Sequence, residues 1–267
     1  MEGEVNLSLH ELKVFLKNMK YLNLIESIKN KKNLGVVPVI AEIKRLTPRL
    51  EKKIKKDTRD AGLLAKLYQK AGAAGISLIT EKKYFGGQPE IDIPKILESV
   101  NLPLLIKDFI RDEQTVNYYL NLVSKINKNY LQRISLLLIV HHLQKTKLQK
   151  LIKLINKKGA LVQIEIMEKE NLSVFKKIRP VPKLFNINNK KIDHLEKGKN
   201  KLIINKLLVQ NCRKIIKDSI LISSSAHQSV DDVRKSIQSG ADAILAGSVF
   251  MKAKNPVKTI RSFVNAL

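Results

Sequence analysis

Acidic and basic side chains interrupt several apolar segments of this chain at positions that suit acid–base chemistry. Glu42 and Lys44 end one such segment, Lys107 ends another, and Glu165 lies near the end of a third. Residues two apart in a strand point to the same side, so Glu42 and Lys44 share a face. A lysine and a carboxylate held together out of water can donate and accept protons in turn. We therefore predict an acid–base site built from Glu42, Lys44, Lys107 and Glu165.

Other apolar segments end in polar or aromatic residues with the same two-residue spacing. The further pairs are Lys107 with Phe109, Gln163 with Glu165, Asn186 with Asn188 and then Lys190, and Ser223 with Ser225. One charged residue at a strand end is more often a solvated cap than a catalytic group. Five strands that repeat the pattern favour a shared site, to which each pair contributes.

A candidate phosphate site follows the last apolar segment, at Gly247 and Ser248. Backbone N–H groups at the start of a helix bind phosphate, and a loop followed by a helix is expected here. Ser225 and Ala226, in the preceding loop, would supply the neighbouring wall. An ordinary turn with an N-capping serine is the alternative interpretation.

Eight short apolar segments with helical patterns between them would position these residues. The segments are residues 36–43, 75–80, 103–110, 135–140, 161–166, 184–188, 220–225 and 243–247. Nearly continuous apolar runs are typical of parallel strands that are buried on both faces. The intervening segment 229–241 has a clear helix start at Ser229, with acidic residues after it, and a stop at Gly240.

Eight repeats of strand and helix in 267 residues predict a single (β/α)₈ barrel. The barrel would span residues 35–267, with a helical extension over residues 1–34. Barrel active sites lie at the carboxyl ends of the strands, where the polar residues described above would meet. A doubly wound open sheet is the alternative fold.

The charge of the chain is strongly positive, with 50 basic against 24 acidic residues and a net charge of +26. The charge has two interpretations: binding to nucleic acid or to an acidic membrane surface, or a compositional bias toward lysine. The lysines are spread along the chain and aromatic residues are few, which favours the second. We expect an anionic small-molecule substrate and no specific nucleic-acid partner.

The remaining composition gives expectations about location and assembly. No apolar run is long enough for a membrane span, and the amino terminus does not have the pattern of a secretory signal. Cys212 is the only cysteine, which fits a reducing, cytoplasmic location. We expect a monomer or a weak homo-oligomer.

Three sequence blocks together resemble the indole-3-glycerol-phosphate synthase family of tryptophan biosynthesis. The first is PVIAEIKRLTP at residues 38–48, and the second joins ISLITEKKYFGG at 76–87 to LPLLIKDFI at 102–110. The third, GADAILAGSVFM at 240–251, is shared by several phosphate-binding barrels. The likeness is strong only up to about residue 112.

The resemblance implies a lyase that closes an indole ring on a carboxyphenylamino-deoxyribulose phosphate, with loss of CO₂ and water and without cofactor or metal. It implies that Lys107 is the general acid, Glu165 its acid/base partner, and Glu42 and Lys44 groups beside the ring. The remaining roles are implied in the same way: Phe85 and Phe109 as an apolar wall, Asn188, Lys190 and Thr47 as substrate-binding groups, and Ser225, Ala226, Gly247 and Ser248 as the phosphate site.

The chain departs from the family pattern on the sixth and seventh strands. Lys190 stands where the family has Arg. The substitution keeps the positive charge but loses the two parallel hydrogen bonds that a guanidinium can donate. Ser224 replaces a Glu, and Ala226 brings a Cβ where the family has Gly. A divergent sugar-phosphate enzyme, a weakened copy of the synthase and, third, a basic nucleic-acid-binding protein remain alternative functions.

Overall fold

The chain folds into a closed barrel of eight parallel strands, as shown by a computed structural model that describes residues 21–47, 56–167, 169–189, 204 and 206–267. Each strand pairs with the next in sequence, and β8 pairs with β1, so the sheet has no edge. The predicted (β/α)₈ barrel is confirmed, and closure excludes the open sheet. The strands are β1 (Val39–Ile43), β2 (Gly75–Ile79), β3 (Leu104–Lys107), β4 (Ile134–Ile139), β5 (Leu161–Ile166), β6 (Leu184–Asn188), β7 (Ile220–Ser224) and β8 (Ala243–Ala246).

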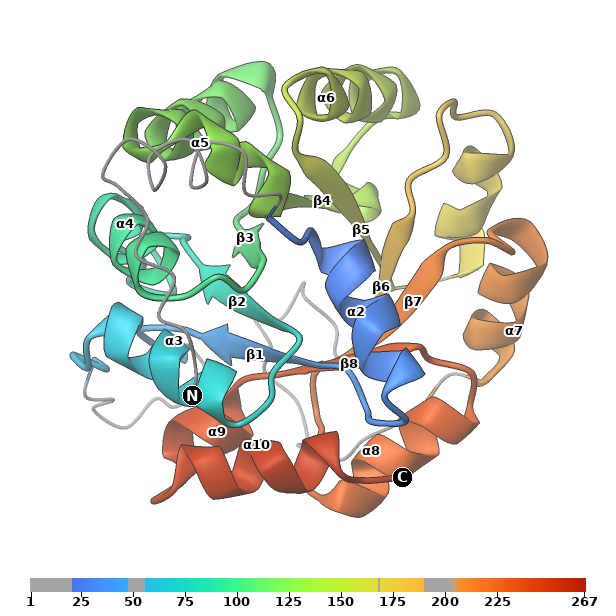
Figure 1. The fold of residues 1–267 in the computed structure, drawn as a ribbon. Helices are drawn as coiled ribbons and strands as arrows, with labels where there is room; N and C mark the ends of the chain where they lie inside the picture. The colour runs from blue at the N-terminus through green and yellow to red at the C-terminus, as the bar shows by residue number, and fades with distance from the viewer. Residues whose placement is uncertain (1–20, 48–55, 168, 190–203, 205) are drawn as a thin grey trace, which may run out of the picture.

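Helices form a ring outside the barrel (Figure 1). The α-helices are α2 (Leu24–Asn33), α3 (Ala61–Lys70), α4 (Pro89–Ser99), α5 (Glu113–Ile126), α6 (Lys145–Lys157), α7 (Lys206–Ile215), α8 (Val230–Gln238), α9 (Ser248–Lys252) and α10 (Pro256–Val264). Short 3₁₀ helices are η1 (Lys128–Arg133), η2 (Val140–His142) and η3 (Lys169–Lys176). Between β5 and β6 the described connection contains only the 3₁₀ helix η3.

Successive residues of each strand face alternately the barrel interior and the helices. Ile40, Leu105 and Ile222 belong to an inner cluster, while Ala41 and other residues of the opposite parity pack against the helices. Because both faces are buried, the strands are apolar almost without interruption. The same alternation carries Glu42, two residues after Ile40, into the interior near the carboxyl ends of the strands.

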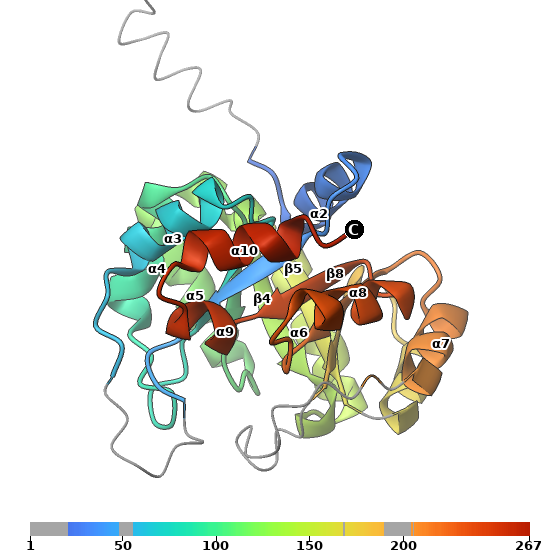
Figure 2. The ribbon, with the colours of Figure 1, turned by 90° about the horizontal axis from the view of Figure 1, so that it is seen from below.

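The helix α2 covers the amino-terminal end of the barrel (Figures 1 and 2). Its Leu24 and Ile28 are fully buried and join the inner cluster. Asn23 and Glu26 form a capping box that fixes where the helix begins. The predicted extension over residues 1–34 thus contributes α2, and its residues 1–20 lie outside the described part of the chain.

The boundaries of α8 agree with the sequence signals. Ser229 caps the helix by accepting a hydrogen bond from the backbone N–H of Asp232, whose carboxylate accepts one from the N–H of Ser229. Gly240 follows with a φ of 102°, a left-handed conformation that glycine adopts without strain.

Within the described ranges, no helix is both long enough and apolar enough to cross a membrane.

Candidate active site

Three charged side chains meet inside the carboxyl-terminal mouth of the barrel. Lys107 Nζ lies 2.9 Å from Glu42 Oε2, and Lys44 Nζ lies 3.5 Å from Glu42 Oε1. Burial by itself raises the pKa of Glu42, but the attraction of Lys107 and Lys44 outweighs it and holds that pKa below its usual value. Glu42 is therefore ionised at neutral pH and bridges two ammonium groups.

A second carboxylate, Glu165 of β5, is held by two amides of β6. Asn186 Nδ2 donates to Glu165 Oε2 at 2.6 Å, and Asn188 Nδ2 donates to Glu165 Oε1 at 3.4 Å. Glu165 and Asn186 are almost completely buried. The strand register places Ile139 and Asn186 on either side of Glu165, so the carboxylate emerges beside an apolar side chain.

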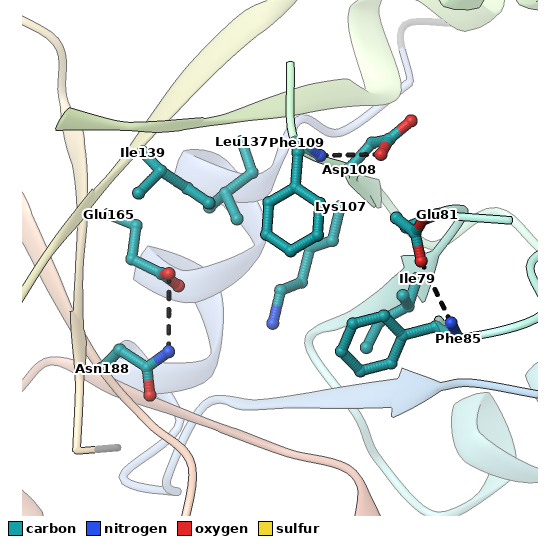
Figure 3. A pocket seen from close by; sticks show the side chains of 10 residues that line it. All are labelled: Ile79, Glu81, Phe85, Lys107, Asp108, Phe109, Leu137, Ile139, Glu165 and Asn188. Atoms are coloured by element: carbon teal, nitrogen blue, oxygen red, sulfur yellow. Dashed lines mark hydrogen bonds between the residues drawn. The ribbon is translucent and has the colours of Figure 1, made fainter. Parts of the chain in front are cut away.

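An apolar pocket opens between these charged groups (Figure 3). Lys107 lies in the middle of the view, with Glu165 and Asn188 on one side and Phe85 on the other. Phe109 packs against the ring of His142, with 5.8 Å between the ring centroids. The pocket is lined by Ile79, Glu81, Phe85, Lys107, Asp108, Phe109, Leu137, Ile139, Glu165 and Asn188. Its apolar walls and its cation suit an aromatic ligand that carries negative charge.

Glu81 positions the Phe85 side of this pocket. Its carboxylate accepts hydrogen bonds from the backbone N–H groups of Lys83, Tyr84 and Phe85 at 2.7–3.0 Å. The carbonyl of Phe85 in turn accepts a hydrogen bond from the N–H of Leu46 at 2.9 Å. The loop after β2 is thereby joined to the loop after β1.

Asp108 positions the opposite side of the pocket. It accepts hydrogen bonds from the Tyr119 hydroxyl of α5 and, at 2.7 Å, from the N–H of Phe109. Burial raises the pKa of Asp108 and the negative charge of Glu81 adds to this, although the two hydrogen bonds oppose the rise. These bonds fix the turn that directs Phe109 over the pocket.

A second, more polar pocket lies beyond Glu42 and Lys44. It is lined by Glu42, Lys44, Ser225, Ala226, His227, Gln228, Leu245, Ala246, Gly247 and Ser248. The buried Lys44 supplies a positive charge to this pocket, and the turn at Gly247 leads into α9. The pair of Lys107 and Glu42 connects the two pockets, because Lys107 lines the first and Glu42 lines the second.

Most residues predicted for the site are brought together by the fold. Glu42, Lys44, Lys107 and Glu165 share the mouth, and the predicted aromatic, amide and phosphate-binding residues line one pocket or the other: Phe85, Phe109, Asn188, Ser225, Ala226, Gly247 and Ser248. Thr47 is half-buried and lines neither pocket. Lys190 lies outside the described residues.

The expectation that Ser223 faces the mouth with Ser225 is wrong. Ile220 and Ile222 belong to the inner cluster, so Ser223 has the opposite parity and faces α8, where it contacts Ser236 at 3.2 Å. The segment therefore delivers Ser225 to the mouth through the turn that follows the strand. Gln163 has the inward parity of Glu165, because Val162 and Ile164 pack against the helices, but it lies two residues deeper and lines neither pocket.

Three residues near the site were not singled out from the sequence. Glu81 and Asp108 were inside the quoted sequence blocks, but their type gave no sign that they hold backbone rather than substrate. His227 has no metal-ligand spacing with another residue in the sequence, yet it lines the second pocket and is buried. Its position directly after Ser225 and Ala226 was the only available signal.

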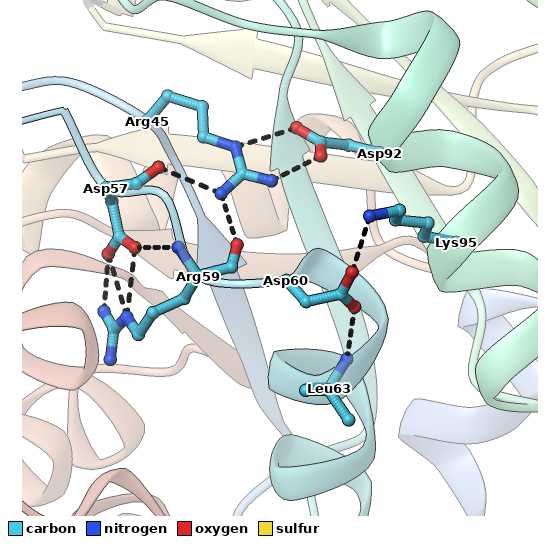
Figure 4. Close-up of polar contacts among 7 residues, drawn as sticks. All are labelled: Arg45, Asp57, Arg59, Asp60, Leu63, Asp92 and Lys95. Carbon is cyan, nitrogen blue, oxygen red and sulfur yellow. Dashed lines mark hydrogen bonds and ion pairs between the residues drawn. The ribbon is translucent and has the colours of Figure 1, made fainter.

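A buried ion pair anchors the loop that leaves β1 (Figure 4). Arg45 donates to both carboxylate oxygens of Asp92 on α4, with 2.9 Å between Nε and Oδ2. The same guanidinium donates to the backbone carbonyls of Asp57, at 3.0 Å, and Arg59, at 2.6 Å. Arg45, next to Lys44 in the chain, thus joins the start of this loop to its end and to α4.

No group of three or more His, Cys, Asp or Glu side chains in the described ranges could hold a metal ion.

A family model and several individual proteins that are similar to this chain all point to the same family. The model of a family described as indole-3-glycerol phosphate synthase matches residues 2–263. The indole-3-glycerol phosphate synthase of Pyrococcus furiosus is 30% identical over 239 residues, which cover 89% of this chain and 94% of that protein. The protein of the same name from Caldanaerobacter subterraneus is 32% identical over 224 residues, covering 84% of this chain and 79% of the relative. The one from Methanopyrus kandleri is 30% identical over 234 residues, covering 86% and 84%.

Proposed function

The chain belongs to the indole-3-glycerol phosphate synthase family, and on that basis we propose the reaction that it catalyses. It closes an indole ring on 1-(2-carboxyphenylamino)-1-deoxyribulose 5-phosphate, with loss of CO₂ and water. One observation carries the proposal: the ion-paired Lys107 and Glu42 stand opposite the buried Glu165, between an apolar pocket and a polar one. The substrate has the matching order of groups, an aromatic ring, a ketone and a phosphate.

Each of the two pockets binds a different part of the substrate. The aromatic ring occupies the pocket walled by Phe85 and Phe109, and the phosphate occupies the pocket formed by the turns at Ser225–Ala226 and Gly247–Ser248. Lys44, held by Glu42 at the junction, attracts the carboxylate of the ring. The sugar chain then passes Lys107 and places its ketone within reach of an acid.

Lys107 acts in the bond-forming step. The aromatic carbon that carries the carboxylate attacks the ketone carbon, and the electron pair of the C=O bond moves onto oxygen. The Lys107 ammonium gives that oxygen a proton, which avoids an alkoxide in a site of low dielectric constant. The carboxylate leaves as CO₂, and the electrons of the broken bond restore the aromatic ring.

Glu165 acts in the dehydration step. Solvent returns a proton to Lys107, which then protonates the new hydroxyl so that it leaves as water, while the carbon next to the ring nitrogen gives up a proton. The Glu165 carboxylate, oriented by Asn186 and Asn188, accepts this proton. Two protons are supplied and one is recovered, so one proton is drawn from solvent for each CO₂ released.

The location and assembly of the protein are also proposals. A cytoplasmic location is supported by the single, buried Cys212, which suits a reducing compartment. We propose a monomer or a weak homo-oligomer, which light scattering of the purified chain at several concentrations would test.

The function is tested by following the fluorescence of the indole product, with Lys107→Ala as the critical variant. We expect turnover by the native chain and a loss of about 100-fold or more in kcat for the variant, because general acid catalysis contributes that much. Lys95→Ala is the matched control: it also removes a lysine paired with a carboxylate, at 2.6 Å from Asp60 on the outer helices. No turnover by the folded native chain at high substrate concentration would refute the proposal.

A further inference from the structure

A buried polar network lies behind the second pocket and joins four parts of the fold. Asn189, after β6, donates from Nδ2 to Ser223 Oγ at 3.0 Å and to the carbonyl of Ser225 at 3.2 Å. Ser223 Oγ lies 3.2 Å from Ser236 Oγ on α8. Ser236 Oγ lies 2.8 Å from His227 Nε2. Ser223, His227 and Ser236 are buried, so their hydrogen bonds act without competition from bulk water.

The backbone next to this network is strained. Ser225 has a φ of 69° and Ala226 a φ of 64°, and no other non-glycine residue in the described ranges has a positive φ. A residue with a Cβ is disfavoured in this left-handed conformation, which glycine adopts freely. Strain of this kind persists only where the surroundings impose it.

The network holds the strained pair from both sides. Before the turn, Asn189 binds the carbonyl of Ser225, whose N–H donates to the carbonyl of Leu245 at 3.2 Å. After the turn, His227 is fixed by its hydrogen bond to Ser236. A glycine at position 226 would need no such restraint. Here Ala226 and His227 occur together, directly on the wall of the pocket assigned to the phosphate.

We propose that His227 is a positioning residue: through Ser236, and with Asn189 at the other end, it holds Ser225 and Ala226 in the left-handed conformation that forms the phosphate-binding wall. The inference rests on the proposed function for the identity of the phosphate ligand. It adds a role for a histidine that takes no part in the proton transfers. It also explains how two residues with a Cβ are kept in a left-handed turn.

The protonation state of His227 agrees with this role. Burial lowers its pKa to about 4, and the nearby Asp232 only partly offsets the effect. The ring is therefore neutral at physiological pH and forms an uncharged hydrogen bond with Ser236. Within the described ranges, its Nδ1 has no hydrogen-bond partner, so Nε2 is the nitrogen that links it to the network.

Binding of inorganic phosphate to the full chain, measured by titration calorimetry, tests the proposal independently of turnover. We expect His227→Leu to weaken phosphate binding about fivefold to tenfold, the effect of one buried hydrogen bond and a destabilised turn. His227→Gln, which keeps a polar group near the position of Nε2, should stay within about threefold of the native chain. In the kinetic assay His227→Leu should raise KM while kcat changes less.

The substitution Ala226→Gly distinguishes a positioning role of His227 from a role in packing alone. If His227 serves to hold the turn, Ala226→Gly should recover most of the phosphate affinity in the His227→Leu background, because glycine needs no restraint there. A packing role for His227 would not be rescued in this way. Should His227→Leu fail to fold, Ser236→Ala removes the same link with a smaller change and is tested with and without Ala226→Gly.

The outcomes are distinct from those of the turnover assay. Phosphate binding by the native chain that weakens in His227→Leu and returns with Ala226→Gly supports the inference, even if no indole product forms. Unchanged phosphate affinity in both His227→Leu and Ser236→Ala overturns it. A native chain that does not bind inorganic phosphate, or a glycine variant that restores nothing, overturns it as well.

Discussion

Gly247 has no side chain, and this leaves room for the carboxylate of Glu42 beside it. A Cβ at this position would lie 2.6 Å from Glu42 Oε1 and 2.9 Å from Glu42 Cβ. Its φ of −134° is open to any residue, so glycine is required by this close approach and not by backbone freedom. The carboxylate that bridges Lys107 and Lys44 therefore depends on the space that Gly247 leaves at the end of the neighbouring strand β8.

Gly247→Ala should displace Glu42 and weaken its contact with Lys107. We expect kcat/KM to fall roughly 10- to 100-fold, since small displacements of catalytic groups have effects of this size. The measurement is steady-state kinetics of Gly247→Ala, Glu42→Ala and the double variant. Glu42→Ala already removes the carboxylate whose displacement lowers activity and leaves only the contact with its Cβ, so the second substitution should add little loss in that background. Full activity in Gly247→Ala would contradict this account of the glycine.

His227 gives the folded chain a specific sensitivity to acid. Its pKa of about 4 in the fold lies below the value of about 6.5 in an unfolded chain, so the unfolded chain binds the extra proton between those values. The stabilisation is present above pH 6.5 and is lost as the pH falls toward 4. Urea unfolding at pH 7 and pH 5 should show that native stability drops by about 2 kcal/mol more than that of His227→Gln. Equal drops would show that the histidine is not buried in its neutral form.

At the scale of elements, Arg45 organises the connection between β1, which carries Glu42, and α3 (Figure 4). The guanidinium satisfies Asp92 on α4 and two backbone carbonyls at the far end of the loop. Arginine suits this task because its planar fork makes several hydrogen bonds at fixed angles, which a lysine ammonium cannot reproduce.

Arg45→Lys should lower the free energy of unfolding by roughly 2 kcal/mol, because buried acceptors lose their donors while the charge is kept. Arg59→Lys is the matched control, because it alters a second arginine–aspartate pair. Arg59 pairs with Asp57, and its side chain is 41% exposed. Exposed pairs contribute little, so that variant should stay within about 1 kcal/mol of the native chain. Equal losses in urea unfolding would argue against a special role for Arg45.

The elements were largely predictable from the sequence, whereas contacts between them were not. Segments such as residues 161–166 and 184–188 match β5 and β6 because strands buried on both faces leave a continuous apolar signal. The meeting of Glu42 and Lys107 at one mouth followed from placing the strand ends together, but their ion pair was not predicted. The outward direction of Ser223 did not follow, since a serine fits either face of a strand. The role of His227 required the backbone angles of the two residues before it.

At the scale of the whole molecule, the chain carries a net charge of +26, and the substrate of its site is an anion. A field of this sign raises the local concentration of anions and speeds their capture. Between about 0.01 M and about 0.15 M ionic strength the Debye length falls from roughly 30 to roughly 8 Å, so most of this long-range attraction disappears.

We therefore expect KM to rise about three- to tenfold over this range of sodium chloride, while kcat stays nearly constant. A neutral sugar at the same osmotic pressure should leave both unchanged. A KM that is independent of salt would mean that the surface charge has no part in capturing substrate.

The position of α2 sets the route by which molecules enter and leave the reaction chamber. Leu24 and Ile28 complete, at the amino-terminal end, the apolar cluster that fills the barrel, so the two pockets of the site open at the carboxyl-terminal mouth. Substrate and all three products must share the opening at the rim. Carbon dioxide and water are small enough to escape around a bound sugar phosphate, but the indole product is not. A fresh substrate molecule must wait for the previous product to leave, so we expect the indole product to inhibit competitively with the substrate.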